Sequence, residues 1–196
     1  MSPPPSSATP PRPAAGAAGP SLRADLLAGA TVVVATPERT PSVAPALTAG
    51  LTGYGARLVP LPPGQPAQVP HADLLLVDLR AVTEAEPATA VTDAFLAARR
   101  AQPALAAAGG AVVFLLPPVP SAANVDLAAD RAALHAAVGS LARSLAQEWA
   151  DHGIRANVLI DDGDAHRTVD LIAYLASPAA VMLTGQLLDL TGTTVD

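Results

Sequence analysis

The sequence contains no cysteine, which excludes disulfide bonds and thiolate metal sites. Aromatic residues make up only 3% of the chain, so we expect a core built mainly from aliphatic side chains. Basic residues form no stripe and the net charge is -6, which argues against a nucleic-acid partner. No segment reaches the roughly 18 consecutive apolar residues that a membrane span requires. We therefore expect neither nucleic acid nor membrane as a partner, and a cytoplasmic location.

The 196 residues are enough for one domain with a sizeable core. Residues 1–22 are rich in Pro and Ala and lack hydrophobic periodicity, so we predict a disordered tail there. Prolines interrupt the apolar stretches of this tail, which argues against a secretory signal. We predict a single domain over residues 23–196.

Short aliphatic runs alternate with alanine-rich or amphipathic segments along this domain. The short runs are typical of buried parallel strands, and the longer segments have helical spacing. This alternation predicts an α/β fold, a doubly wound, Rossmann-like parallel sheet of about six strands. The expected strands are Ala30–Ala35, Arg57–Leu61, Asp73–Leu79, Ala111–Leu116, Arg155–Ile160 and Gln186–Leu190, and the expected helices are Pro41–Tyr54, Thr89–Ala108, Leu127–Asp151 and Val169–Ala176.

Two blocks in the C-terminal half carry a family resemblance. Ser144–Asn157 reads S-L-A-Q-E-W-A-D-H-G-I-R-A-N, and Tyr174–Gly192 reads Y-L-A-S-P-A-A-V-M-L-T-G-Q-L-L-D-L-T-G. They resemble the S-L-A-x-E-x-A-x-x-G-I-R-V-N and F-L-A-S-D-x-A-x-Y-I-T-G-Q-x-L-x-V-D-G runs of the short-chain dehydrogenases/reductases, most nearly the 3-oxoacyl-carrier-protein reductase type. The order of elements extends the resemblance over residues 26–194 and implies a reduced form of that family's fold.

The resemblance also locates the family's cofactor motif. These enzymes bind NAD(P) through T-G-x-x-x-G-x-G after the first strand, where glycines let the backbone approach the pyrophosphate. The aligned stretch keeps only Thr36. Pro37, Pro41 and Val43 replace the glycines, and Glu38 adds a negative charge. The resemblance therefore implies a vestigial cofactor site, and we expect no cofactor.

The catalytic positions of the family are replaced in the same way. Its serine falls at Pro117 or Pro118, and its tyrosine and lysine fall on Arg131 and His135. A slip of one helical turn would place that pair on Leu127 and Arg131 instead. The family's acid catalysis needs a phenol and a lysine ammonium. We interpret Pro117, Arg131 and His135 as vestigial positions, and expect the last two to form an exposed polar pair beside a vacated cleft.

Two segments are shorter than in the family, and a third has lost its motif. Only a loop fits between Leu61 and Asp73, where the family has a helix, a strand and a further helix, so one edge strand should be missing. The family's Asn-Asn-Ala-Gly motif falls on Val77–Arg80, and none of its residues is kept. Asp161–Asp164 replaces the Pro-Gly turn and the substrate-covering segment. A pocket without this cover is open to water, which is poorly suited to hydride transfer.

The acidic turn could also suggest a metal site formed by Asp161, Asp162, Asp164 and His166. Loops that bind hard cations need a longer pattern of ligands. We therefore favour a solvated acidic turn and expect no metal.

In the resembled family, two long helices and the last strand form subunit interfaces. These are the elements that this chain keeps best. We hypothesise a non-catalytic subunit that pairs with an active ketoreductase homologue as a heterodimer or heterotetramer, or with itself, plausibly in acyl or polyketide metabolism. The candidate interface residues on the two long helices are Phe95, Arg99, Leu141, Ser144, Leu145 and Glu148.

Two alternatives stay open. The old cleft could carry repurposed chemistry that uses Arg131, His135 and Asp78. The chain could also be a cofactor-free scaffold that associates only with itself.

Overall fold

A computed structural model describes residues 22–36, 44–82, 87–120 and 125–192. Within these residues the strands form one six-stranded sheet with the order β2-β1-β3-β4-β5-β6. Every neighbouring pair runs parallel. This confirms the predicted doubly wound α/β fold. The strands are β1 (Thr31–Ala35), β2 (Arg57–Pro60), β3 (Leu74–Asp78), β4 (Ala111–Leu116), β5 (Arg155–Ile160) and β6 (Leu187–Asp189).

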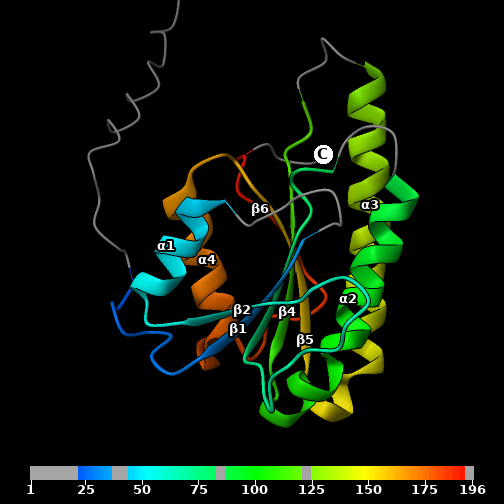
Figure 1. Ribbon diagram of the computed structural model, residues 1–196. Helices are drawn as coiled ribbons and strands as arrows, with labels where there is room; N and C mark the ends of the chain where they lie inside the picture. Colours follow the sequence, from blue (N-terminus) through cyan, green and yellow to red (C-terminus); the bar gives the residue numbers. More distant parts are fainter. Residues whose placement is uncertain (1–21, 37–43, 83–86, 121–124, 193–196) are drawn as a thin grey trace, which may run out of the picture.

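Helices cover both faces of the sheet (Figure 1). α1 (Pro45–Gly53) and α4 (Ala165–Ala176) lie on one face, and α2 (Pro87–Ala108) and α3 (Val125–Glu148) lie on the other. The strand order reverses between β1 and β3, so this is the topological switch point of the sheet. Within the described part of the chain, no helix is long and apolar enough to cross a membrane.

Side chains of successive strand residues enter two separate cores. On β4, Val112 and Phe114 point toward α2 and α3, whereas Val113 and Leu115 point toward α1 and α4. Because a parallel sheet is buried on both faces, its strands read as unbroken apolar runs. The helix-facing partners are often small, and α2 buries Ala90, Ala94, Ala97, Ala98, Ala101 and Ala104. The core is therefore mostly aliphatic, as predicted.

The helix ends differ from the predicted ones for local reasons. α4 begins at Ala165 rather than Val169, because the side chain of Asp164 caps it by accepting hydrogen bonds from the backbone N–H groups of His166 and Arg167. α3 ends at Glu148 rather than Asp151, and a 3-10 turn, η1 (Ala150–His152), follows it.

The segment between β2 and β3 is a loop without a helix or strand, as predicted. It packs along α2 through hydrogen bonds from Ala67 N to Arg100 O (3.4 Å) and from Ala72 N to Ala104 O (2.9 Å). β2 is consequently an edge strand of the sheet. The predicted N-terminal tail lies outside the described residues except for Leu22.

Candidate functional site

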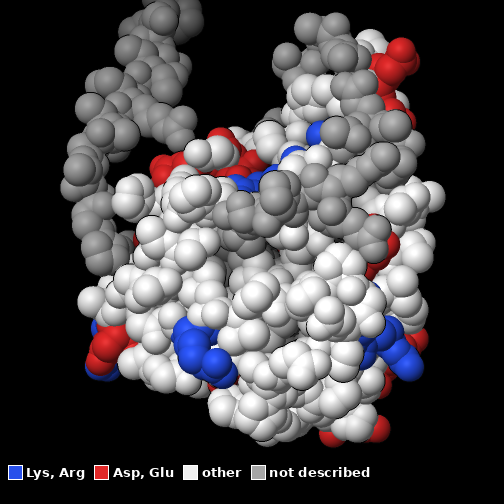
Figure 2. All heavy atoms as spheres, viewed as in Figure 1, with Lys and Arg blue, Asp and Glu red and all other residues white. Residues whose placement is uncertain are grey.

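The carboxyl ends of the four central strands meet at one edge of the sheet, where doubly wound folds bind their ligands. Thr36 follows β1, Asp78 ends β3, Pro117 follows β4 and Asp161 follows β5. The fold thus brings together the positions that the resemblance aligned with the family's cofactor and catalytic motifs. Figure 2 shows acidic and basic side chains side by side near this edge, in the upper part of the view. The predicted vestigial residues Pro37, Pro41 and Val43 lie outside the described residues.

An ion triad dominates this edge. The guanidinium of Arg80 donates to both oxygens of Asp78, with Nε–Oδ1 at 2.9 Å and Nη2–Oδ2 at 2.8 Å. Its Nη1 donates to Oδ2 of Asp161 at 2.7 Å. Because β4 lies between β3 and β5, the side chain of Arg80 passes the end of β4 to reach Asp161. The triad therefore joins two strands that are not neighbours in the sheet.

Each carboxylate of the triad is buried and well supplied with donors. Asp161 also accepts from Oγ1 of Thr168 at 2.7 Å and from the backbone N of Gly163 at 2.9 Å. Burial alone would raise the pKa of Asp161, but the hydrogen bonds from Arg80, Thr168 and Gly163 outweigh it, so the pKa lies below its ordinary value. Burial likewise opposes the charge on Arg80, yet the two carboxylates raise its pKa.

The predicted solvated acidic turn is therefore wrong for Asp161, whose carboxylate is buried against Arg80 and Thr168. The sequence gives no local sign of the pairing with Arg80, because Arg80 lies 81 residues before Asp161. The mostly buried Asp162 pairs with the more exposed Arg167, and Asp164 caps α4. Among the described residues, no group of three or more His, Asp or Glu side chains is arranged to hold a metal ion.

His135 is buried rather than exposed, so this part of the prediction is wrong. Only 7% of the residue is accessible, because it lies on the inward side of α3. Its Nε2 donates to the carbonyl oxygen of Pro117 at 2.8 Å. Burial lowers the pKa of His135, and the nearby charge of Arg131 lowers it further. The residues aligned with the family's lysine and serine are thus hydrogen-bonded to each other.

Groups able to carry out the family's proton transfer are missing from this edge. All eleven basic side chains of the sequence are arginine, so no lysine ammonium is present in the chain. Tyr54 bonds to Asp170 between α1 and α4, and burial raises its pKa to about 12. The hydroxyl of Tyr174 donates to Ala179 O at 3.4 Å, beside η2 (Pro178–Ala180). Neither phenol belongs to the edge that Pro117 and His135 occupy.

The resembled family would place NAD(P) along this edge. Its nicotinamide chemistry needs backbone access and a free catalytic pair, whereas here Arg80 is fixed across the end of β4 and His135 is fixed to Pro117. The described residues therefore do not fit the cofactor in the family's manner. The alternative of a repurposed activity that uses Asp78 is also disfavoured, because both carboxylate oxygens of Asp78 already accept hydrogen bonds from Arg80.

A cavity of about 210 Å³ lies near the switch point of the sheet. It is bounded by Ala35 and Thr36 at the end of β1, by Gly64 in the loop between β2 and β3, and by Asp93 and Arg100 on α2. The Nε atom of Arg100 is enclosed there without a hydrogen-bond partner among the described residues. Sequence reasoning missed this cavity, because its walls come from three distant segments.

The outer faces of α2 and α3 hold most of the predicted interface residues. Phe95 is 38% exposed, and Leu96 beside it is a further exposed apolar residue that the sequence analysis missed. Leu145 is only 1% exposed and packs in the core, so its assignment to an interface is wrong. It continues the inward stripe of Val138 and Ala142, a spacing that the sequence already contains. Of the other predicted residues, Leu141 is partly buried, and the exposed ones are Arg99, Ser144 and Glu148.

Comparison with known proteins supports the resemblance. No family model matches the chain. A curated relative, a tropinone reductase homolog from Arabidopsis thaliana, is 29% identical over 134 residues, which are 54% of this chain and 51% of the relative. The matched part thus spans about half the length of that protein.

Solved structures resemble the chain over most of its length. A short-chain dehydrogenase/reductase from Brucella ovis has a TM-score of 0.57 and 17% identity, covering 82% of this chain and 99% of that one. A citronellol catabolism dehydrogenase from Pseudomonas aeruginosa has a TM-score of 0.62 and 17% identity, covering 86% and 96%. At this identity the likeness shows the fold alone, which is that of the short-chain dehydrogenases/reductases.

Proposed function

We propose that this chain is a degenerate member of the short-chain dehydrogenases/reductases, a subunit without redox activity of its own that stabilises or modulates an active homologue. One observation carries the proposal. The positions aligned with the catalytic lysine and serine, His135 and Pro117, are engaged in a hydrogen bond with each other, and Arg80 is held between two carboxylates. These contacts stabilise the fold and engage His135, Arg80 and its two carboxylates with the protein itself.

The outward faces of α2 and α3 support an associating role. α3 exposes small side chains at helical spacing, which would let a second helix approach closely. On α2, Phe95 and Leu96 add apolar area beside the charged Arg99. The small exposed residues of α3 include Ala132, Ala133, Ala136, Ala137 and Ser140.

The partner that we propose is an oxidoreductase of the same fold in the cytoplasm, plausibly a ketoreductase of acyl or polyketide intermediates. The names of the similar proteins, a tropinone reductase homolog and a citronellol catabolism dehydrogenase, support a partner of the dehydrogenase or reductase class. The substrate class rests on the resemblance.

Co-expression with candidate homologues, followed by native mass spectrometry, tests the association. We expect a complex that contains both chains. Phe95→Asp should weaken it at least about tenfold, because a charge in a desolvated contact costs well over 1.4 kcal/mol. Val119→Asp is the matched control, since Val119 is exposed in the segment after β4 and belongs to neither helix.

A stable monomer that forms no complex with any of the homologues would contradict the proposal. A complex of identical chains alone would favour the scaffold alternative.

Calorimetric titration with NAD(H) and NADP(H) tests the loss of redox function. We expect no saturable heat at millimolar cofactor. Tight binding would contradict the argument from Arg80 and His135 and would reopen an enzymatic role.

A further inference from the structure

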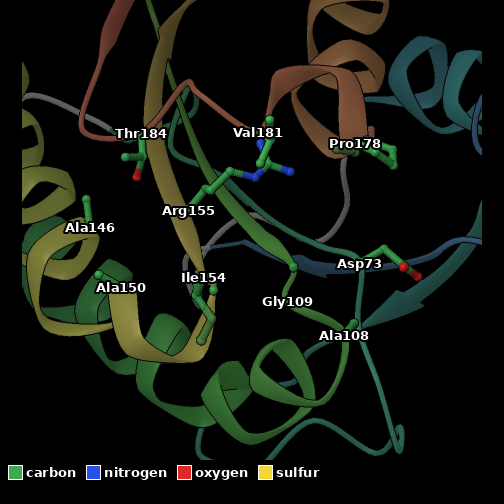
Figure 3. A pocket seen from close by; sticks show the side chains of 13 residues that line it. Asp73, Ala108, Gly109, Ala146, Ala150, Ile154, Arg155, Pro178, Val181 and Thr184 are labelled. Carbon is green, nitrogen blue, oxygen red and sulfur yellow. The ribbon is translucent and has the colours of Figure 1, made fainter.

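A second cavity lies at the opposite edge of the sheet, where the strands begin. Its volume is about 500 Å³ (Figure 3). Asp73 before β3, Gly110 before β4 and Arg155 at the start of β5 contribute to it, and Pro178 and Val181 close another side. This cavity is separate from the carboxyl edge, so a ligand bound in it would be independent of the proposed function.

Arg155 places a buried positive charge in this cavity. Only 9% of the residue is accessible. Among the described residues it forms no ion pair with any carboxylate. Asp73 lines the same cavity, but its Oδ2 accepts from the backbone N of Thr31 at 2.8 Å. Burial lowers the pKa of Arg155, yet a guanidinium stays charged at neutral pH because its ordinary value is so high.

The hydrogen bonds of Arg155 leave one edge of the guanidinium free. Nη1 donates to the carbonyl oxygens of Leu175 at 2.7 Å and Ala180 at 3.2 Å. Within the described part of the chain, Nε and Nη2 have no acceptor. Both atoms are also accessible. Among the described residues, the buried side-chain nitrogen or oxygen without a hydrogen-bond partner is Nε of Arg100, and neither atom of Arg155 belongs to that class. Figure 3 shows the guanidinium projecting between Val181 and Pro178 into the cavity.

The free edge has the geometry of a carboxylate receptor. Its Nε–H and one N–H of Nη2 are parallel, and this fork matches the two oxygens of one carboxylate. A single negative charge fits better than a phosphate dianion. Only one cation is available, the protein already carries a net charge of -6, and α2 and α4 end beside the cavity at Ala108 and Ala176 with their negative dipole ends.

The remaining walls suit a short apolar body attached to that carboxylate. Apart from Asp73, they consist mainly of small or aliphatic side chains. They include Ala146, Ala150, Ile154, Pro178 and Val181.

We propose that this cavity binds a small aliphatic monocarboxylate, whose two oxygens accept from Nε and Nη2 of Arg155 and whose apolar chain lies against Ala150, Ile154 and Val181.

Titration of the full chain with butyrate tests the site, with butyramide as the neutral probe of equal shape. The NMR signal of the Arg155 Nε–H should shift downfield and saturate with butyrate, and it should not respond to butyramide. A wild-type protein without saturable binding, or with equal responses to the two probes, would overturn the proposal.

Two variants separate the site from the fold. Arg155→Lys loses the fork and should bind butyrate about tenfold more weakly or worse. Because the Leu175 and Ala180 carbonyls also use Arg155, a variant that leaves this residue intact is needed. Val181→Trp narrows the mouth of the cavity at a residue that is 65% exposed, and it should also weaken binding.

Met182→Trp is the matched control, since Met182 is the next residue, is exposed, and does not line the cavity. It should bind butyrate as the wild type does. Equal affinities in Val181→Trp, Met182→Trp and the wild type would count against the site.

Discussion

The arginines at the two edges of the sheet differ in their hydrogen-bond partners. At the carboxyl edge, Arg80 donates to two carboxylates and all three side chains are satisfied by one another. At the amino edge, Arg155 donates only to backbone carbonyls and keeps one side of its guanidinium open to a cavity. At the edge where this fold ordinarily binds its ligands, Arg80 is therefore paired with the protein's own carboxylates, whereas Arg155 at the opposite edge keeps two donor nitrogens without a protein partner.

Removing the cation of the triad should have the largest effect on stability. Arg80→Met leaves Asp78 and Asp161 as uncompensated buried charges next to each other, and we expect the free energy of unfolding to fall by about 3–5 kcal/mol. Urea denaturation at pH 7 measures this. Arg23→Met is the matched control, because both side chains of the Arg23–Asp25 pair are exposed, so that its loss should change stability very little. Equal losses of stability in the two variants would contradict the expected difference between buried and exposed ion pairs.

The same substitution at the amino edge should cost less. Arg155→Met removes two hydrogen bonds but leaves no charge behind, because the partners of Arg155 are neutral carbonyls. We expect a loss of about 2 kcal/mol in the same urea experiment. A loss as large as that of Arg80→Met would show that the two edges do not differ in this respect.

The smallest effect concerns the hydrogen bond between His135 and Pro117. At pH 7, His135→Gln should lower the free energy of unfolding by about 1 kcal/mol. The wild type should also be sensitive to pH, because the pKa of His135 is lower in the folded state than its ordinary value of 6.5. The unfolded chain then binds the proton more readily, so stability is complete above about pH 6.5 and decreases as the pH falls below it.

Urea denaturation between pH 7.5 and 5 compares the two proteins. The slope of stability against pH over this range should be smaller in His135→Gln. His152→Gln is the control, since His152 is exposed at the end of η1. An unchanged slope in His135→Gln would mean that another group titrates in its place.

Local patterns predicted the fold well, whereas contacts between distant residues were missed. The β4 run Ala111–Leu116 is apolar throughout because both faces of the strand are covered, and the structure has these same bounds. The burial of Leu145 could have been predicted from its helical spacing to Val138 and Ala142. The pairing of Arg80 with Asp161 could not, because only the order of the strands brings these residues to one edge.

At the vestigial positions, too, the sequence predicted one aspect of the structure and missed another. The resemblance aligned Pro117 and His135 with two catalytic positions of the family, and the structure shows these residues in contact. The resemblance gave no sign that His135 would face inward, since a histidine next to Arg131 is typical of a helix surface. His135 is buried together with Leu134 and Val138, on the side of α3 that packs mainly against β5.

The loop between β2 and β3 has a consequence for self-association. Among the described residues no strand pairs with the outer side of β2, and an open strand edge can pair with strands from other molecules. β2 is short, starts with the exposed Arg57 and ends at Pro60, which has no N–H to donate. These features disfavour continuation of the sheet from one molecule into the next. Arg57 and Pro60 thus disfavour aggregation through the edge strand β2. Oligomerisation is then more favourable through helical faces than through this strand.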